Sequence, residues 1–472
     1  MATITTGRGT VPEPAIDELR AAVGAQLITS EDDRYDDARR VWNGMIDRRP
    51  ALIVACRGVA DVVASVRFAR AHDLPLAVRG GGHNVAGFGT CDAGLVIDLS
   101  PMRDVRVDPT SKTARVAGGA TWADVDRETQ LFGLAAPGGI VSTTGVAGLT
   151  LGGGQGWLRR TYGMACDRLI SADVVTAEGE LVRASDSEHA ELFWALRGGG
   201  GNFGVVTSFE FQLAPVGPLV AFAGPAYPLA DAASVLAGMR NFAVDAPDEV
   251  NVSATFWSIP AGPAFPEHLH GREVVIVGGV YIGPTDDGER FLEPLRQLAE
   301  PILDLSGVLP YTALQQMFDP FFPAGQLRYY WKSIYLERLD DEAVATIARF
   351  AASRPSAASM VGLWALGGAL ARVDPTATAA GGCEAPYLLE ILANWEAPER
   401  SDANIAWARD LFAAAQPFSS GRTNFNFPGL GDDPGFVRSA LGPSWDRLVE
   451  VKRRYDPTNL FRLNQNVDPE SA

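Results

Sequence analysis

The sequence predicts an α+β protein with two domains, and three observations support this prediction. Its 472 residues exceed what one hydrophobic core usually holds, so two domains are expected. The first half alternates short apolar runs with glycine-rich loops, whereas longer strand-like runs and amphipathic helices follow from about residue 219. Pro215 and Pro218 mark the change. This second pattern is typical of an antiparallel sheet with helices on one face.

The first half is expected to begin with helical pieces at residues 15–50, followed by short strands and helices. The strands are expected at residues 51–55, 74–78, 94–99, 105–107, 114–116, 169–176, 181–184 and 205–213. The helices are expected at residues 61–72, 121–132 and 188–196. Asp61 and Thr121 are residue types that accept hydrogen bonds from free helical N–H groups, so both are the expected N-caps.

The second half is expected to alternate long strands with helices. The strands are expected at residues 250–259, 273–282, 329–336, 360–366 and 387–395. The helices are expected at residues 230–244, 286–300, 340–352, 402–415 and 444–455. Residues 459–466 are rich in asparagine but include apolar side chains, so this tail is expected to pack against the rest of the chain.

Composition excludes several classes of function. The formal net charge of −17 argues against nucleic acid or an anionic membrane surface as a partner. The four cysteines are scattered, so neither a disulfide framework nor a metal site is predicted. Residues 1–14 lack the pattern of a signal peptide, and no apolar run is long enough for a membrane span. A cytoplasmic protein is expected, and nothing indicates its oligomeric state.

A glycine-rich loop at residues 79–84 comes directly after one of the short strands. Consecutive glycines allow positive φ angles and a close approach of the backbone to a ligand. His83 lies at the tip of this loop. Taken alone, the motif is more often a tight turn with a surface histidine, so its meaning depends on the other motifs of the chain.

Residues 129–158 contain no charged side chain, although they include many glycines, serines and threonines. A solvated loop of this length would normally contain charge, so the stretch is expected to be buried against something. Small residues with free N–H groups can form an anion-binding nest that would suit a diphosphate. A glycine-rich crossover inside the core explains the same composition equally well, and both interpretations stay open at this point.

Five blocks of sequence together resemble one family. They lie at residues 79–84, 145–154, 162–167, 192–206 and 455–466. In this order they resemble the FAD-linked oxidases of the vanillyl-alcohol oxidase type, specifically the berberine-bridge-enzyme-like group. The resemblance implies a bipartite FAD-binding domain made of residues 1–217 and 416–472. It also implies a substrate domain at residues 218–415, whose sheet covers the isoalloxazine ring.

The same resemblance implies where FAD binds. In the family, the loop histidine is joined through a ring nitrogen to the flavin 8α-methyl group, and His83 matches that position. A neutral imidazole is a nucleophile, and the link should raise the redox potential of the flavin. The residues expected to contact FAD are Arg79, Gly80, Gly81, Gly82, His83, Asn84, Gly138, Val141, Ser142, Thr143, Gly145, Val146, Gly148, Gly152, Val206, Asn464 and Asn466.

A second covalent link is not expected. Family members that have one carry a cysteine shortly after the Pro-Gly turn, and this chain has Val141 there, just before Ser142. Cys166 lies in the neighbouring block, and a free cysteine is usually a small buried residue.

The expected catalytic residues depart from the family. Many relatives carry Tyr-x-Asn late in the chain, whereas this chain has Asn424 and Asn426, which strand alternation would place on one face. An amide cannot accept a proton at neutral pH, so the usual base is missing. The remaining candidates on the covering sheet are Tyr329, Tyr330, Lys332, Tyr387 and Glu390, although aromatic residues in strands are usually packing residues and Lys332 could simply reach water. A neutral amine substrate could lose hydride without a dedicated base.

The sequence therefore predicts an FAD-dependent oxidoreductase. It would transfer hydride from an alcohol or amine C–H bond of a small organic molecule or secondary metabolite to the flavin, and O2 or another acceptor would reoxidise it. The small residues at 381–383 indicate an open, weakly polar pocket. The alternatives are an FAD-containing scaffold for a non-redox cyclisation or rearrangement, and a binding protein that has lost turnover.

Overall fold

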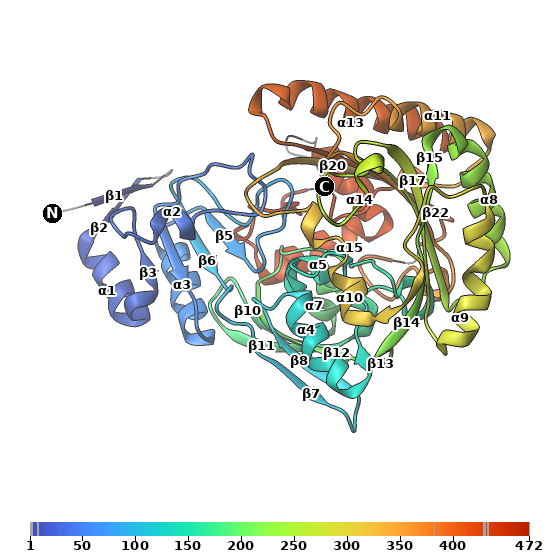
Figure 1. The fold of residues 1–472 in the computed structure, drawn as a ribbon. Coiled ribbons are helices and arrows are strands. Elements are labelled where there is room, and N and C mark those ends of the chain that lie inside the picture. The colour runs from blue at the N-terminus through green and yellow to red at the C-terminus, as the bar shows by residue number, and fades with distance from the viewer. Residues whose placement is uncertain (1–2, 7–8, 382, 428–430, 432–433, 472) are drawn as a thin grey trace.

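The computed structural model describes residues 3–6, 9–381, 383–427, 431 and 434–471 (Figure 1). A four-stranded and a five-stranded sheet belong to the N-terminal half, and a nine-stranded sheet belongs to the C-terminal half. Among these described residues, no helix combines the length and the apolar character that crossing a membrane requires.

The four-stranded sheet has the order β3-β4-β6-β5, and β6 pairs in parallel with both of its neighbours. Its strands are β3 (Leu27–Ile28), β4 (Leu52–Ala55), β5 (Leu76–Arg79) and β6 (Leu95–Asp98). The elements beside it are β1 (Thr3–Thr6), β2 (Gly9–Pro12), α1 (Glu13–Val23), α2 (Tyr35–Ala38) and α3 (Val59–Ala71). Since parallel strands are covered on both faces, β4, β5 and β6 are apolar except for the buried Arg79 and Asp98 at the ends of β5 and β6, and the glycine loop follows directly at the carboxyl end of β5.

The five-stranded antiparallel sheet has the order β11-β10-β12-β8-β7. Its strands are β7 (Val105–Asp108), β8 (Thr113–Ala117), β10 (Leu169–Val175), β11 (Leu181–Ser185) and β12 (Val205–Gln212). Nearby lie α4 (Trp122–Thr129), α5 (Val146–Leu151), α6 (Arg159–Tyr162) and α7 (Ala190–Leu196), and the short pair β9 (Leu134–Ala135) and β13 (Ala214–Pro215).

The nine-stranded sheet contains the strands of the chain from residue 219 to residue 395. Its strands are β14 (Leu219–Ala223), β15 (Pro225–Pro228), β16 (Val250–Ser258), β17 (Glu273–Tyr281), β18 (Leu303–Asp304), β19 (Gly307–Pro310), β20 (Arg328–Leu336), β21 (Met360–Ala365) and β22 (Tyr387–Trp395). The helices of this half are α8 (Ala232–Asp245), α9 (Thr285–Leu292), α10 (Tyr311–Gln316), α11 (Asp341–Ala351), α12 (Ala369–Arg372) and α13 (Ser401–Ala415). Helices α8, α11 and α13 cover one face of the sheet with a shared apolar core, which leaves the other face to meet the N-terminal half (Figure 1).

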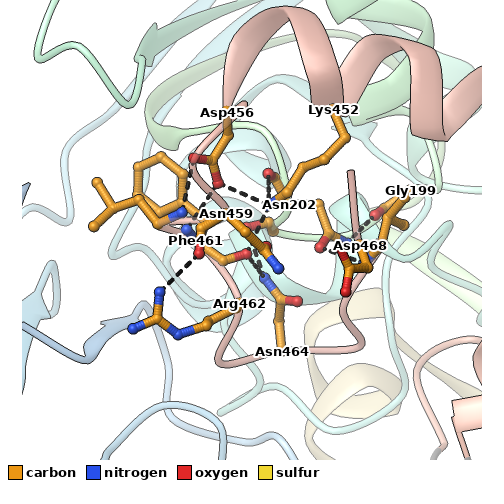
Figure 2. A network of polar contacts seen from close by, with 12 residues as sticks. Gly199, Asn202, Lys452, Asp456, Asn459, Phe461, Arg462, Asn464 and Asp468 are labelled. Atoms are coloured by element: carbon orange, nitrogen blue, oxygen red, sulfur yellow. Dashed lines mark hydrogen bonds and ion pairs between the residues drawn. The ribbon is translucent and has the colours of Figure 1, made fainter. Parts of the chain in front are cut away.

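The C-terminal part returns to the N-terminal half. Helix α14 (Pro434–Leu441) is followed by α15 (Trp445–Tyr455), which packs against α7 (Figure 1). The tail after α15 is fixed by a buried network around Lys452 (Figure 2). The Lys452 ammonium donates hydrogen bonds to Asp456 Oδ2, to the Asn202 carbonyl and to the Phe461 carbonyl, at 2.8, 2.8 and 3.0 Å. All three ammonium protons are therefore satisfied, and Asp456 in turn accepts from the Phe461 amide.

Most predicted elements are confirmed, within one to three residues at their ends, but the helix expected at residues 286–300 ends at Leu292 and continues only as a 3-10 helix to Gln297. Thr121 is confirmed as an N-cap, since it forms a capping box with Asp124. The prediction for Asp61 is wrong: α3 begins at Val59 after Gly58, and the Asp61 carboxylate accepts a hydrogen bond from the Arg57 amide. The prediction missed the short strands β14, β15, β18 and β19, which have few residues in which a period can be seen.

Candidate functional site

A cavity of about 300 Å³ lies where the glycine loop, the uncharged stretch and the C-terminal tail meet the helix-free face of the large sheet. Twelve of the residues predicted to bind FAD line it: Arg79, Gly80, Gly81, Gly82, His83, Asn84, Val141, Gly145, Gly148, Gly152, Val206 and Asn464. The other five lie beside this wall: Gly138, Ser142, Thr143, Val146 and Asn466. The uncharged stretch is therefore buried as expected, in part as a wall of this cavity and in part in the apolar core.

Glycine is required where the two glycine-rich segments touch. A Cβ atom built on Gly81 would lie 2.4 Å from the Gly145 nitrogen, and one built on Gly145 would lie 2.4 Å from the Gly81 nitrogen. Gly82 additionally has a φ of +70°, which side chains other than glycine rarely adopt. The main chain is thus exposed to the cavity on both sides of this contact.

His83 is held from two sides. Its imidazole stacks on the Trp42 indole, with ring centroids 4.8 Å apart and an interplanar angle of 16°. Its Nε2 lies 3.1 Å from Thr143 Oγ1, and its Nδ1 lies 3.4 Å from Thr144 Oγ1. Burial lowers the pKa of His83 to about 4, so the ring is neutral at physiological pH and retains a lone pair.

Asp319 holds the segment at residues 142–144, which contains the two threonines beside His83. The Asp319 carboxylate accepts from the Ser142 amide at 2.8 Å and from the Ser142 hydroxyl at 2.6 Å. On the other side, the carbonyl of Thr144 accepts from the Trp122 amide at the start of α4. Ser142 therefore fixes the loop beside the cavity, and its side chain does not point at a ligand.

Arg79 is engaged in the structure of the loop. Its Nε and Nη2 donate to the two carboxylate oxygens of Asp98 at 3.1 and 2.7 Å, and Nη1 donates to the Arg40 carbonyl. Both members of this ion pair are buried. The guanidinium therefore stabilises the base of the glycine loop and leaves main-chain groups to face the cavity.

The large sheet contributes a carboxyl group to the cavity. Glu390 on β22 lies deep in the protein with its side chain partly exposed to the cavity, and burial raises its pKa to about 7. Its Oε2 accepts a hydrogen bond from Trp364 Nε1 at 2.8 Å. The Arg159 guanidinium lies 4.3 Å from the centroid of the Trp364 ring and partly offsets the effect of burial on Glu390. Glu390 is thus a carboxyl group poised to gain or lose a proton near neutrality.

Three of the predicted catalytic residues lie on the other face of the sheet. Tyr330, Lys332 and Tyr387 face the helix layer and are not among the residues that line the cavity. The Lys332 ammonium lies 4.8 Å from the centroid of the Phe412 ring. Tyr329 lies on the cavity side but is buried beneath Trp42, with ring centroids 3.7 Å apart. Because strand residues alternate between faces, Trp331, which lies between Tyr330 and Lys332 in the chain, faces the cavity.

Asn424 and Asn426 both line the cavity, but the prediction that they share a strand face is wrong. Residues 423–427 form a turn. The Asn424 Oδ1 atom accepts a hydrogen bond from the Asn426 main-chain amide, which in a strand would instead bond to a neighbouring strand. The Asn426 amide group then donates to the Leu149 carbonyl at the end of α5. The pair therefore closes the cavity where the C-terminal segment crosses α5.

Gly381 and Cys383, two of the three small residues expected at the pocket wall, do not line this cavity. Gly381 and Cys383 lie at a separate, smaller cavity of about 30 Å³, and Gly382 lies outside the described residues. The expectation that these residues form an open wall of this cavity is therefore wrong for Gly381 and Cys383.

Sequence reasoning missed most of the aromatic lining. The cavity includes Trp42, Phe322, Trp331, Trp364 and Phe427, of which Trp331 and Phe427 stack at 5.5 Å. Gln155 is a further residue that was missed. An aromatic residue in a strand indicates packing as often as a site, so no local signal distinguished these residues.

Two family models match the chain. The model of the FAD binding domain matches residues 50–185, and the model described as berberine and berberine like matches residues 423–468. These are the two segments that enclose the cavity from the side opposite the large sheet.

Similar proteins match over nearly the whole chain. The chain is 33% identical over 467 residues to (R)-6-hydroxynicotine oxidase of Paenarthrobacter nicotinovorans, covering 96% of this chain and 98% of that protein. It is 31% identical over 452 residues to the FAD-linked oxidoreductase YgaK of Bacillus subtilis, covering 94% and 97%. The solved structure of 6-hydroxy-D-nicotine oxidase from Arthrobacter nicotinovorans matches with a TM-score of 0.85 and 31% identity, covering 95% and 98%. Chitooligosaccharide oxidase shares the fold, with a TM-score of 0.84, 22% identity, and coverage of 97% of this chain and 100% of that one.

Proposed function

The chain belongs to the berberine-bridge-enzyme-like FAD-linked oxidoreductases, and we propose that it oxidises a small, largely apolar alcohol or amine with Glu390 as proton acceptor. FAD-dependent oxidation of a small molecule follows from the family. The observation that supports the finer proposal is the Glu390 carboxyl group in the cavity wall, with its raised pKa, opposite the glycine loop.

The residues present fit FAD. Gln155 Oε1 and Asn464 Oδ1 are buried acceptor atoms at the cavity that make no hydrogen bond with any described residue. FAD has hydroxyl, amide and amine donors that can satisfy such oxygens. The glycine loop and residues 145–152 would hold the cofactor through main-chain groups, with no lysine needed for the diphosphate.

We further propose a single covalent link, through His83. The imidazole is neutral, oriented and at the cavity wall, as a nucleophile must be. The bond would join an imidazole nitrogen to the 8α-methyl carbon with loss of one C–H proton and the imidazole N–H proton, and the two electrons left on the flavin would pass with both protons to O2, giving hydrogen peroxide. Cys166 is completely buried and does not line the cavity, and Val141 occupies the position of the second linking cysteine, so neither supports a second link.

The residues of the cavity wall support separate roles for FAD, for the aromatic side chains and for Glu390 in the proposed reaction. When bound, FAD supplies a hydride acceptor at flavin N5. Trp331 and Phe427 would hold an apolar or aromatic part of the substrate against that acceptor. The ionised Glu390 carboxylate would accept the proton of the substrate O–H or N–H group as hydride leaves the adjacent carbon. O2 is the proposed final acceptor.

The domain division is part of the same proposal. Residues 1–217 and 416–472 would form the FAD-binding domain, and residues 218–415 the substrate domain. The strands β14 to β22 all belong to the large sheet, and they all lie within residues 218–415, which supports this division. The cytoplasmic location stays a prediction.

An anaerobic screen tests the proposed reaction. Arylalkyl amines, the corresponding alcohols and oligosaccharides of similar size are added to the oxygen-free protein, and the absorbance of the oxidised flavin is followed. We expect bleaching by an apolar amine or alcohol and none by an oligosaccharide, because aromatic rings and a single carboxyl group are what the described residues of the large sheet offer, whereas the lining amides belong to the loops and the C-terminal segment. Product formation without bleaching would instead establish the non-redox scaffold.

A further inference from the structure

A short segment outside the matched FAD-binding region joins the glycine loop to the large sheet. The fully buried Asn43 donates from Nδ2 to the Val85 carbonyl at 2.7 Å and to the Tyr329 carbonyl at 2.9 Å. The Trp42 amide donates to the Gly82 carbonyl at 3.1 Å. Residues 42–43 therefore fix the distance between the loop that carries His83 and the start of β20.

The Trp42 indole is held in one orientation between the glycine loop and the large sheet. The indole stacks on the Tyr329 ring, with ring centroids 3.7 Å apart and 15° between planes, and it also stacks on the His83 imidazole. The indole Nε1 donates a hydrogen bond to the Phe322 carbonyl at 2.9 Å, so the indole ring cannot rotate without losing a buried hydrogen bond. Tyr329 is itself fixed by the hydrogen bond from its hydroxyl to the Pro323 carbonyl.

The stack and the threonine hydroxyl constrain different motions of His83. Contact with Trp42 sets the plane of the imidazole, whereas Thr143 Oγ1 at Nε2 limits rotation within that plane. A reaction between two held groups depends steeply on their alignment, and a misplacement of about 1 Å can cost about a hundredfold in rate. The orientation of the ring therefore matters as much as its presence.

We propose that Trp42 is a positioning residue for the covalent flavin link, acting by holding the His83 imidazole in one plane with Thr143 as its partner. This inference rests on the proposed link through His83. It assigns the stack of Tyr329, Trp42 and His83 a role in attachment of the cofactor, distinct from the role of Glu390 in oxidation of the substrate.

The test compares covalent and released flavin in four purified variants and the wild type. Trp42→Met removes the ring but keeps an apolar side chain that can fill the space, and Trp42→Phe keeps a flat ring. Thr143→Val removes the hydroxyl at an exposed position without a change of size. Trp407→Met is the matched control, because Trp407 is likewise buried and donates its indole N–H to a carbonyl, that of Phe350, within the helix layer. Each protein is precipitated with acid, and flavin is measured in pellet and supernatant, together with the thermal unfolding midpoint.

We expect the covalent share of the bound flavin to fall about tenfold in Trp42→Met and by a smaller factor in Thr143→Val. Trp42→Phe and Trp407→Met should stay close to the wild type. A covalent share in Trp42→Met equal to that of the wild type would overturn the inference. If Trp42→Met does not fold, an unchanged share in Thr143→Val would overturn it. A wild type that releases all of its flavin would instead refute the His83 link itself, and the inference with it.

Discussion

Replacing His83 by alanine is expected to remove all covalently bound flavin while FAD still binds. The imidazole is the only proposed linking group, whereas the glycine loop and the asparagine tail that would hold the cofactor are unchanged by the substitution. The acid-precipitated wild type should stay yellow, and the variant should release its colour into the supernatant. Without the link, the flavin potential should fall and reduction by substrate should slow by about tenfold.

A matched control is available in His72, a half-buried histidine at the end of α3 that packs against Phe68. His72→Ala should keep the covalent flavin. A yellow acid pellet from His83→Ala would show that another residue forms the bond, and the assignment of His83 would fail.

Replacing Glu390 by glutamine is expected to lower kcat/KM by about 10² to 10⁴. The amide keeps the size of the side chain and can still accept a hydrogen bond from Trp364 Nε1, but it cannot accept a proton. The stopped-flow rate of flavin reduction, measured with any substrate found in the anaerobic screen, checks this result. The exposed Glu396, just beyond β22, provides the control Glu396→Gln, which should leave the rate unchanged.

The pH dependence of the same variant gives a second readout. Burial raises the pKa of Glu390 from 4.5 to about 7, so kcat/KM of the wild type should increase with pH through about 7 as the carboxylate forms. The effect on stability has the opposite sign, because a raised pKa means that ionisation is unfavourable in the folded state. Folding stability should therefore decrease as pH rises from about 4.5 to about 7, and Glu390→Gln should remove that contribution. An unchanged pH profile in the variant would exclude Glu390 as the proton acceptor.

The fold was largely predictable because its long elements have a clear period. The strands that became β16, β17, β20, β21 and β22 are long runs in which apolar and aromatic residues predominate, and the apolar residues of the amphipathic helices that cover them repeat every three to four positions. Which face of β20 looks into the cavity was not predictable. Because this strand is buried on both sides, no polar alternation distinguishes Trp331 from Lys332.

The site was predictable only where the backbone needs special residues. Gly81 and Gly145 are required by the contact between two main chains, and Gly82 is required by its positive φ, so the need for glycine is visible in the sequence. Trp42 is different, since its role depends on contacts with Tyr329 and Phe322, almost three hundred positions away, and no local pattern reports them. The turn at Asn424 was missed for a related reason, because a side-chain hydrogen bond overrode the apparent strand alternation.

Peptide mapping of the acid-denatured wild type tests the central claim most directly. Trypsin cleaves after Arg79 and Arg103, so residues 80–103 form one peptide that contains His83, and cleavage after Arg160 and Arg168 gives a peptide with Cys166. We predict that residues 80–103 carry the mass and fluorescence of flavin and that residues 161–168 are unmodified. An unmodified peptide 80–103, with all flavin released by acid, would contradict the account.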